Sequence, residues 1–246
     1  MSVKNIVYNA LANPHRRAAL RQLRDFESKL LSPRSRFALP FVYRGHGHFK
    51  TIQPKQNPLE IEELFELACD LEPQRVLEIG TARGGTLYLW TQAARPDATI
   101  VSVDLPGGPF GGAYCMYRTP FYQSFAREGQ RLHLERADSH DPQTVRQVTD
   151  LFANQPADFL FIDGDHTYEG VKADFEQYGP LVRPGGLIGL HDVLPRDDAP
   201  AIEVHRLWDQ IQSKYDGREI VGPEGSGRKI GIGVVRVPDT GINVAP

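Results

Sequence analysis

Residues 75–86 of this 246-residue chain read RVLEIGTARGGT. Their first five residues, Arg75–Ile79, form a short apolar run, which is typical of a buried parallel strand. Gly80 ends this run, two further glycines follow, and residues 86–90 begin a helix-like pattern. Glycines allow close backbone approach, and the first turn of a helix has free N–H groups. The stretch therefore predicts a strand, a tight turn and a helix that together form a platform for a nucleotide-like ligand.

The glycine-rich turn differs from the dinucleotide fingerprint G-x-G-x-x-G. Ala82 occupies the second glycine position, where the backbone must approach a pyrophosphate. Glu78 would oppose that pyrophosphate, whereas its carboxylate suits a ligand with an ammonium group or sugar hydroxyls. The pattern E-x-G-x-x-x-G-G thus disfavours a nicotinamide cofactor. A turn whose glycines serve geometry alone is the alternative interpretation.

Composition and charge exclude several classes of protein. The net charge is −3 with both signs mixed, so nothing indicates a nucleic-acid partner. No stretch approaches the ~20 apolar residues of a membrane span, and no signal peptide is visible. The two cysteines, Cys69 and Cys115, form neither a disulfide framework nor a zinc motif. We expect a cytoplasmic protein with no membrane partner.

The chain divides into an N-terminal helical extension with a lid loop, residues 1–58, and a ligand-binding domain, residues 59–246. Leucines are spaced among arginines over residues 1–35, which predicts a basic amphipathic helix. Its leucines are expected to pack against the domain or against a second subunit of a homo-oligomer. Residues 36–58, rich in aromatic residues, glycine and proline, predict an ordered loop or lid.

Strand and helix patterns alternate through the domain, which indicates an α/β fold with a parallel sheet covered on both faces. A glycine-rich turn at 222–227 precedes the last strand and favours a terminal hairpin. The predicted strands are 75–79, 98–103, 132–136, 158–162, 186–190 and 229–236, and the predicted helices are 58–68, 142–152, 168–178 and 201–215.

Acidic residues follow the second and third predicted strands, where ligands of open α/β sheets bind. Asp104 lies ~20 residues beyond the glycines, the position from which an acid usually holds ribose hydroxyls. Asp138 could accept a hydrogen bond from an adenine amino group, or it could cap the next helix. Asp141, beside Pro142, is expected to be such a cap.

The ends of the fourth and fifth strands carry the most concentrated polar groups. Asp163, Asp165 and His166 follow the fourth strand, and His191 and Asp192 follow the fifth. Asp163, His191 and Asp192 could converge on one cation, and His166 could act as a general base. Loop capping and hydrogen bonding among these groups is the alternative interpretation.

These motifs resemble the class I methyltransferases that use S-adenosylmethionine (SAM). Within that class, VLEIGTARGGT, VSVDLP, ADSHDP, FIDGDHTYEGVKADFE and LVRPGGLIGLHDV are similar to metal-dependent small-molecule O-methyltransferases, a group with macrolide-sugar O-methyltransferases and cephalosporin-hydroxylase-like proteins. The resemblance covers residues 75–192. It implies a Rossmann-like, doubly wound, mostly parallel seven-stranded sheet with an antiparallel C-terminal strand.

The resemblance also implies roles for individual residues. His191 departs from the pattern, because metal-binding relatives have an acid there, and imidazole shifts the preference from magnesium toward manganese. A metal-free enzyme with a histidine base stays open. By resemblance, Asp163 and Asp192 are metal ligands and His166 is the base; the arrangement of the strand ends adds His191 as a third metal ligand. The residues expected to bind SAM are Glu78, Gly80, Thr81, Gly85, Thr86 and Asp163, with Asp104 at its ribose and Asp138 and Ser139 at its adenine.

The expected reaction is methyl transfer from SAM to a hydroxyl of a small molecule, either a sugar or a natural-product alcohol or phenol. Tyr114, Tyr117 and Arg118, in the irregular stretch 106–122, could stack on or clamp this substrate, and they could equally fill a subunit interface. The loop 41–58 is a second candidate for substrate recognition. The alternatives are a non-catalytic SAM- or nucleotide-binding protein and an NAD-dependent oxidoreductase.

Overall fold

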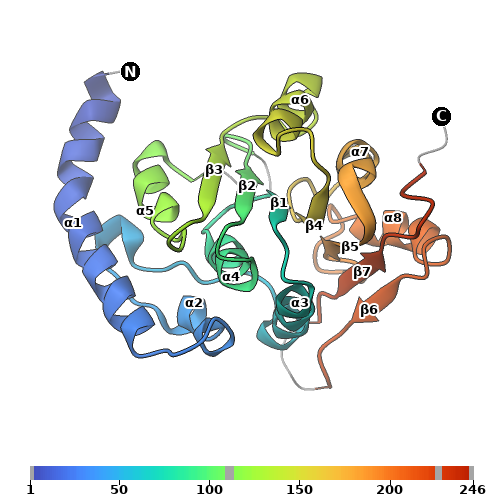
Figure 1. The fold of residues 1–246 in the computed structure, drawn as a ribbon, viewed down its shortest axis with the longest axis horizontal. Helices are drawn as coiled ribbons and strands as arrows, with labels where there is room; N and C mark the ends of the chain where they lie inside the picture. Colours follow the sequence, from blue (N-terminus) through green and yellow to red (C-terminus); the bar gives the residue numbers. More distant parts are fainter. Residues whose placement is uncertain (1–2, 109–113, 225–228, 244–246) are drawn as a thin grey trace.

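The computed structural model describes residues 3–108, 114–224 and 229–243, with the side chains of the first helix described from Asn13 onward. Within these ranges seven strands form one sheet in the order β3-β2-β1-β4-β5-β7-β6 (Figure 1). The first five strands along the chain are parallel to one another. The strand β7 pairs antiparallel with both of its neighbours, β5 and β6. The strands are β1 (Arg75–Ile79), β2 (Thr99–Val103), β3 (Arg131–Glu135), β4 (Ala157–Ile162), β5 (Val182–His191), β6 (Arg218–Ile220) and β7 (Ile232–Arg236).

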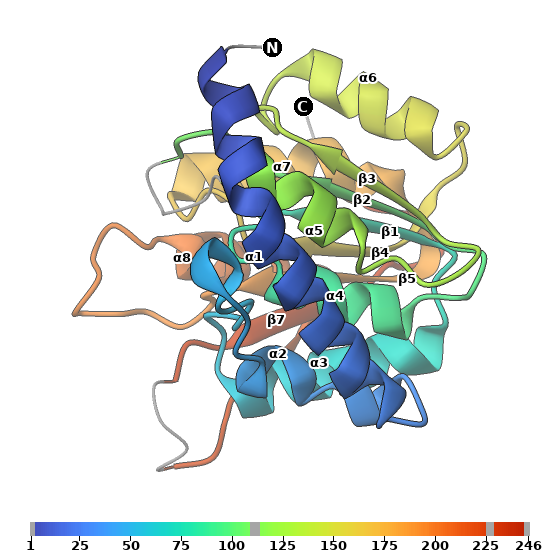
Figure 2. The ribbon, with the colours of Figure 1, turned by 90° about the vertical axis from the view of Figure 1, so that its left-hand side faces the viewer.

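Helices cover both faces of the sheet, so the predicted doubly wound α/β fold is confirmed (Figure 2). One face is covered by α3 and α4, and the other by α6, α7 and α8. The α-helices are α1 (Val3–Ser28), α2 (Leu39–Val42), α3 (Pro58–Leu71), α4 (Gly85–Ala93), α5 (Thr119–Gln123), α6 (Pro142–Leu151), α7 (Tyr168–Tyr178) and α8 (Val204–Ile211).

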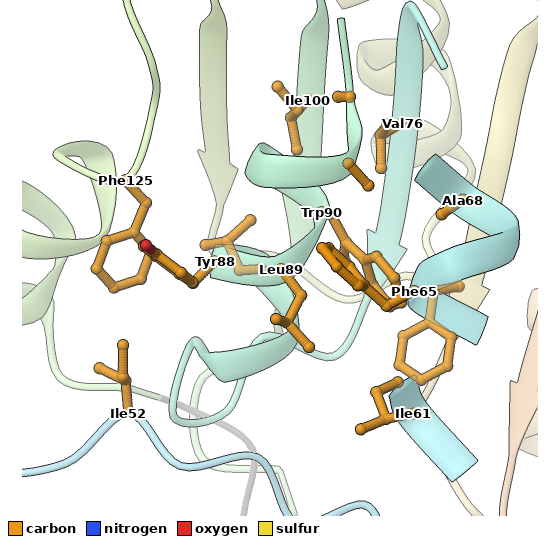
Figure 3. Packing of buried hydrophobic residues seen from close by; sticks show 14 of the residues in the cluster. Ile52, Ile61, Phe65, Ala68, Val76, Tyr88, Leu89, Trp90, Ile100 and Phe125 are labelled. Atoms are coloured by element: carbon orange, nitrogen blue, oxygen red, sulfur yellow. The ribbon is translucent and has the colours of Figure 1, made fainter. Parts of the chain in front are cut away.

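Large aromatic side chains fill the core beneath α3 and α4 (Figure 3). Trp90 of α4 is fully buried, and its ring lies 4.8 Å from Phe159 and 5.2 Å from Phe161, measured between ring centroids. Phe65 of α3 belongs to the same cluster. Burying an aromatic side chain of this size removes 150–250 Å² from water, so this layer anchors the strands whose ends form the site.

The N-terminal segment packs into this same core. Leu23 of α1, Tyr43, Phe49 and Ile52 are fully buried in the cluster that also contains Trp90. Figure 2 shows α1 crossing the side of the molecule next to α5. Residues 36–58 connect α1 to α3, and they include α2 and a short 3₁₀ turn; their role as a lid stays a prediction.

Several element boundaries differ from those expected. The predicted strand 186–190 begins earlier, at Val182, because the chain pairs with β4 on both sides of an irregularity. The predicted helix 201–215 is shorter and begins at Val204, since the backbone N–H of Glu203 is held by the carbonyl of His166. The last strand begins at Ile232.

The antiparallel end of the sheet is confirmed, although β6 was not among the predicted strands. Its three residues are too few to show an alternating pattern. Of the glycine-rich turn expected at 222–227, residues 225–227 lie outside the described residues. No helix in the described part of the chain is both long and apolar enough to cross a membrane.

Candidate active site

A cavity of about 490 Å³ opens at the carboxyl ends of β1, β2, β4 and β5. Parallel strands end at the same edge of a sheet, so residues far apart in the sequence meet there. Of the predicted site residues, those that line the cavity are Gly80, Asp104, Asp138, Ser139, Asp163, His166, His191 and Asp192.

The glycines of the turn are required by contacts within the protein. Gly80 has φ +97°, and a Cβ there would collide with the carbonyl oxygen of Asp163. A Cβ on Gly85 would collide with the carbonyl of Ile52 and the ring of Pro54. Gly85 and Thr86 are buried under this segment and line a smaller recess beside the cavity. Close approach between backbones therefore explains both glycines.

Asp104 holds the turn in shape. Its Oδ2 accepts hydrogen bonds from the backbone N–H groups of Thr81, at 2.9 Å, and Ala82, at 2.7 Å. The second of these supports the left-handed conformation of Ala82, which has φ +43°. Asp104 also lines the cavity and is 3% exposed. Its position is compatible with the predicted contact to ribose, which stays a prediction.

Glu78 lies behind the cavity. Its side chain is 0% exposed, and its Oε2 accepts a hydrogen bond from Ser102 Oγ at 2.5 Å. Ser102 is the β2 residue directly opposite in register and also contacts Thr81 Oγ1, at 2.6 Å. Burial raises the pKa of Glu78 to about 8, with Ser102 acting in the opposite direction. Glu78 is therefore protonated near neutral pH, and its predicted contact with SAM stays a prediction.

The loop after β3 forms another wall of the cavity. Asp138 accepts from the backbone N–H of His140, and Tyr178 donates to the carbonyl of Ser139. His140, which the sequence analysis did not single out, lies 3.4 Å from the buried Asp174. The nearby carboxylate of Asp174 raises the pKa of His140 to about 9, against the effect of burial. The predicted cap is present: Asp141 accepts from the N–H of Gln143.

Four side chains converge beyond β4 and β5: Asp163, His166, His191 and Asp192. One ligand atom from each lies within 4.8 Å of the others. His166 Nδ1 lies 2.7 Å from Asp192 Oδ2, and His191 Nδ1 lies 2.8 Å from Asp163 Oδ1. Asp192 adopts a left-handed backbone conformation, with φ +63°. The predicted convergence of the two strand ends is thus present in the structure.

Asp165, the other acid after β4, has a structural role. Its Oδ1 accepts hydrogen bonds from the backbone N–H and the hydroxyl of Thr167, at 2.9 and 2.8 Å. Thr167 in turn caps α7. Loop capping, the alternative interpretation of the cluster, therefore describes Asp165.

Charge is balanced within the four-residue group. Burial alone would lower the pKa of His191, but Asp163 and Asp192 raise it to about 10. Burial alone would raise the pKa of Asp192, but hydrogen bonds with His166 and His191 hold it well below its usual range. Arg196 adds a further positive charge, 2.8 Å from Asp192 Oδ1. In this state His191 is an imidazolium paired with two carboxylates.

The donor set fits a divalent metal ion. Two carboxylates, Asp163 and Asp192, together with the imidazole of His191 suit manganese and other transition metals, whereas magnesium prefers oxygen alone. Neither ring nitrogen of the buried His191 makes a well-aligned hydrogen bond among the described protein atoms, in spite of the short distance to Asp163. A metal ion would replace the proton of His191, because a ligating imidazole must be neutral.

Two residues that the sequence analysis missed hold the carboxylates of this group. Gln56 Nε2 donates to Asp163 Oδ2 at 2.6 Å, and Arg196 donates to Asp192 Oδ1 at 2.8 Å. Arg196 follows Asp192 by four residues, but both lie in a loop, and this spacing predicts a contact between side chains only in a helix. Gln56 is separated from Asp163 by 107 positions, so no local pattern connects them.

The predicted substrate residues lie near the N-terminal segment. Tyr114 is buried against the ring of Tyr122, and Tyr117 packs on His48. Arg118 donates to the hydroxyl of Tyr122 and to the carbonyl of His48. Tyr114, Tyr117 and Arg118 are not among the cavity-lining residues in the described ranges, and residues 109–113 of this stretch are outside them. Their role in substrate recognition stays a prediction.

Comparison with known proteins gives relatives of unassigned function. R132 of Acanthamoeba polyphaga mimivirus is 28% identical over 173 residues, which cover 69% of this chain and 71% of that protein. The protein y4gI of Sinorhizobium fredii is 28% identical over 145 residues, 57% of this chain. The match spans only 15% of y4gI's own length.

Solved structures share the fold. TomG, an O-methyltransferase of Streptomyces achromogenes involved in tomaymycin synthesis and solved with SAM, has a TM-score of 0.55 at 18% identity, over 91% of this chain and 98% of TomG. An O-methyltransferase of Bacillus cereus, in complex with SAH (S-adenosylhomocysteine), has a TM-score of 0.53 at 20% identity, over 71% of this chain and 79% of that one.

The family comparison covers the strand ends described above. Residues 77–193 match the family model described as a methyltransferase domain. This range runs from β1 to the residue after Asp192 and includes the glycine-rich turn and the four-residue group. Residues 77–193 of this chain are therefore similar to methyltransferase domains.

Proposed function

We propose that the protein transfers a methyl group from SAM to a hydroxyl of a small molecule, a sugar or a natural-product alcohol or phenol. One observation carries the proposal: the wall formed by Gly80, Asp104 and Asp138 and the group formed by Asp163, His166 and Asp192 line the same cavity. Cofactor and acceptor would therefore meet directly. The two solved O-methyltransferases of this fold, whose descriptions name SAM or SAH, support the choice of cofactor.

SAM supplies an electrophilic methyl group, so the protein must align a nucleophile and remove its proton. His166 is placed for the second task. Its Nδ1 lies 2.7 Å from Asp192 Oδ2, which fixes the proton of the neutral ring on Nδ1. Nε2 is then the basic atom and can take the hydroxyl proton while the oxygen–methyl bond forms and the sulfur–methyl bond breaks.

Asp163 and Asp192, with His191, would hold a divalent metal ion. Such an ion lowers the pKa of a bound hydroxyl and orients it. Without it, the Asp192–His166 pair retains the arrangement of a base and its orienting carboxylate. Both routes end with the same proton on His166 Nε2.

A non-catalytic SAM-binding protein is the second candidate, because the carboxylates of Asp163 and Asp192 balance the charge of His191 without a metal. The test is to incubate the protein with SAM and a panel of hexoses, sugar nucleotides, catechols and aliphatic alcohols, with EDTA or with manganese. The proposal expects SAH together with an acceptor that is one methyl group heavier by mass spectrometry. Saturable SAM binding without turnover on any acceptor would favour the second candidate.

A further inference from the structure

The segment Ile52–Gln56 lies across the glycine-rich turn. Ile52 is fully buried in the core beside Tyr88 and Phe125 (Figure 3). The missing side chain of Gly85 leaves room for the backbone of Ile52 and the ring of Pro54 at the start of α4. The chain thus passes directly over the turn, and this path brings Gln56 to the end of β4.

At that point Gln56 contacts the four-residue group. Its side chain is 5% exposed, and Nε2 donates to Asp163 Oδ2 at 2.6 Å. The other carboxylate oxygen, Asp163 Oδ1, lies 2.8 Å from His191 and 3.7 Å from His166. The two oxygens therefore have separate tasks: Oδ2 is held by Gln56, and Oδ1 faces the histidines.

The backbone of Asp163 does not by itself fix this division. Its N–H is bound to the carbonyl of Ile79, and its carbonyl lies against Gly80, so the main chain is held by β1. The carboxylate can still rotate about its own side-chain bonds. Among the described residues, the amide of Gln56 is the group that engages Oδ2.

Gln56 is also an unusual residue for a purely structural position. Its Oε1 is buried and has no hydrogen-bond partner among the described protein atoms. An apolar side chain of the same size would fill the space without burying an unpaired oxygen. The amide is oriented with its N–H toward Asp163, because the reverse orientation would bring two oxygens together at hydrogen-bond distance.

We propose that Gln56 is a positioning residue, which fixes the Asp163 carboxylate so that Oδ1 is presented to the metal and the histidines. The proposal rests on the proposed function of the same site. It also gives residues 52–56 a role beyond that of a lid, since the N-terminal segment completes the metal site. Partners of a ligating carboxylate typically contribute ~10–100-fold to metal affinity.

The test compares wild type with Gln56→Leu, which keeps the volume and removes the amide. The exposed Gln155 offers a matched control, Gln155→Leu. Each protein is titrated calorimetrically with SAH and then with Mn²⁺ in saturating SAH, and its thermal midpoint is recorded. We expect Gln56→Leu to bind Mn²⁺ about 10–100-fold more weakly, with SAH affinity unchanged and with Gln155→Leu like wild type.

A second variant, Gln56→Asn, keeps the amide but is one methylene too short to reach Asp163, and it should show the same loss. It decides the question if Gln56→Leu does not fold. A lower thermal midpoint with unchanged Mn²⁺ affinity would overturn the positioning role. Wild type that binds SAH but no Mn²⁺ would overturn the metal site and with it this role. Wild type that binds no SAH would overturn the proposed function itself.

Discussion

Replacing His166 with alanine tests the assignment of the base. The side chain of His166 is 14% exposed, so it lies largely within the site. Water can enter the space that it leaves when it is replaced by alanine. Asp192 would lose its partner at 2.7 Å but would keep Arg196 at 2.8 Å and His191 at 3.3 Å. The carboxylate therefore stays ionised and paired, and we expect the fold to persist.

The expected loss of turnover follows from the role of a general base. Such a group typically contributes ~10²–10⁴-fold in rate, or about 2.7–5.4 kcal/mol of barrier. The lost hydrogen bond to Asp192 would cost about 1.5–3 kcal/mol of folding free energy at most, since it involves a charged group. His166 lies at the ends of β4 and β5, beside Asp163 and Asp192, so we expect SAH affinity to be unchanged.

The assay is methyl transfer from radiolabelled SAM to the best acceptor of the panel, with SAH binding measured in parallel. Added imidazole should restore part of the activity, because it can occupy the vacated space and accept the proton. His133→Ala, a change on the edge strand β3 outside the cavity lining, is the control. A loss of less than tenfold, below the ~10²–10⁴ range of general bases, or a collapse of SAH affinity would refute the reasoning.

Three further changes test the surroundings of the site. Burial raises the pKa of Glu78 from 4.5 to about 8. Between pH 4.5 and about pH 8 the carboxyl group of Glu78 is therefore ionised in the unfolded state and protonated in the folded state. Stability should therefore fall with rising pH there by at most about 1.4 kcal/mol per unit. Glu78→Gln should remove this slope in urea unfolding, and an unchanged slope would count against the assignment. Gly80→Ala should abolish SAH binding, because its Cβ would strike the carbonyl of Asp163; normal binding by calorimetry would contradict this. The buried carboxylate of Glu60 accepts hydrogen bonds from the backbone N–H groups of Gly222, Ile230 and Gly231. Glu60→Ala should therefore destabilise the fold by about 3 kcal/mol or more; a urea midpoint like that of wild type would contradict this.

Local sequence patterns were sufficient to predict the sheet and one edge of the site. The run 75–79 and the helix 168–178 have the predicted bounds, because a buried strand and a capped amphipathic helix carry their own periodicity. The convergence of Asp163 with His191 also followed from topology, since adjacent parallel strands end side by side. These features depend on short stretches of chain.

Other features depend on contacts between distant segments and left no local signal. Gln56 reaches Asp163 only because the N-terminal segment packs under α1 and across Gly85. The glycines of the turn looked like a ligand platform, whereas the structure shows that two of them accommodate backbone contacts. The partner of His140, the buried Asp174, comes from a helix 34 positions later in the chain. Tertiary packing determines each of these contacts.

The most direct test of the central claim is a calorimetric titration of the protein with SAM, SAH and NADH. If the cavity at the strand ends is a SAM site, SAM and SAH will bind saturably at one site per chain, and NADH will not bind. Asp104→Ala should weaken both SAM and SAH, because Asp104 shapes the turn and lines the cavity. Binding of NADH in place of SAM would contradict the cofactor assignment and the roles derived from it.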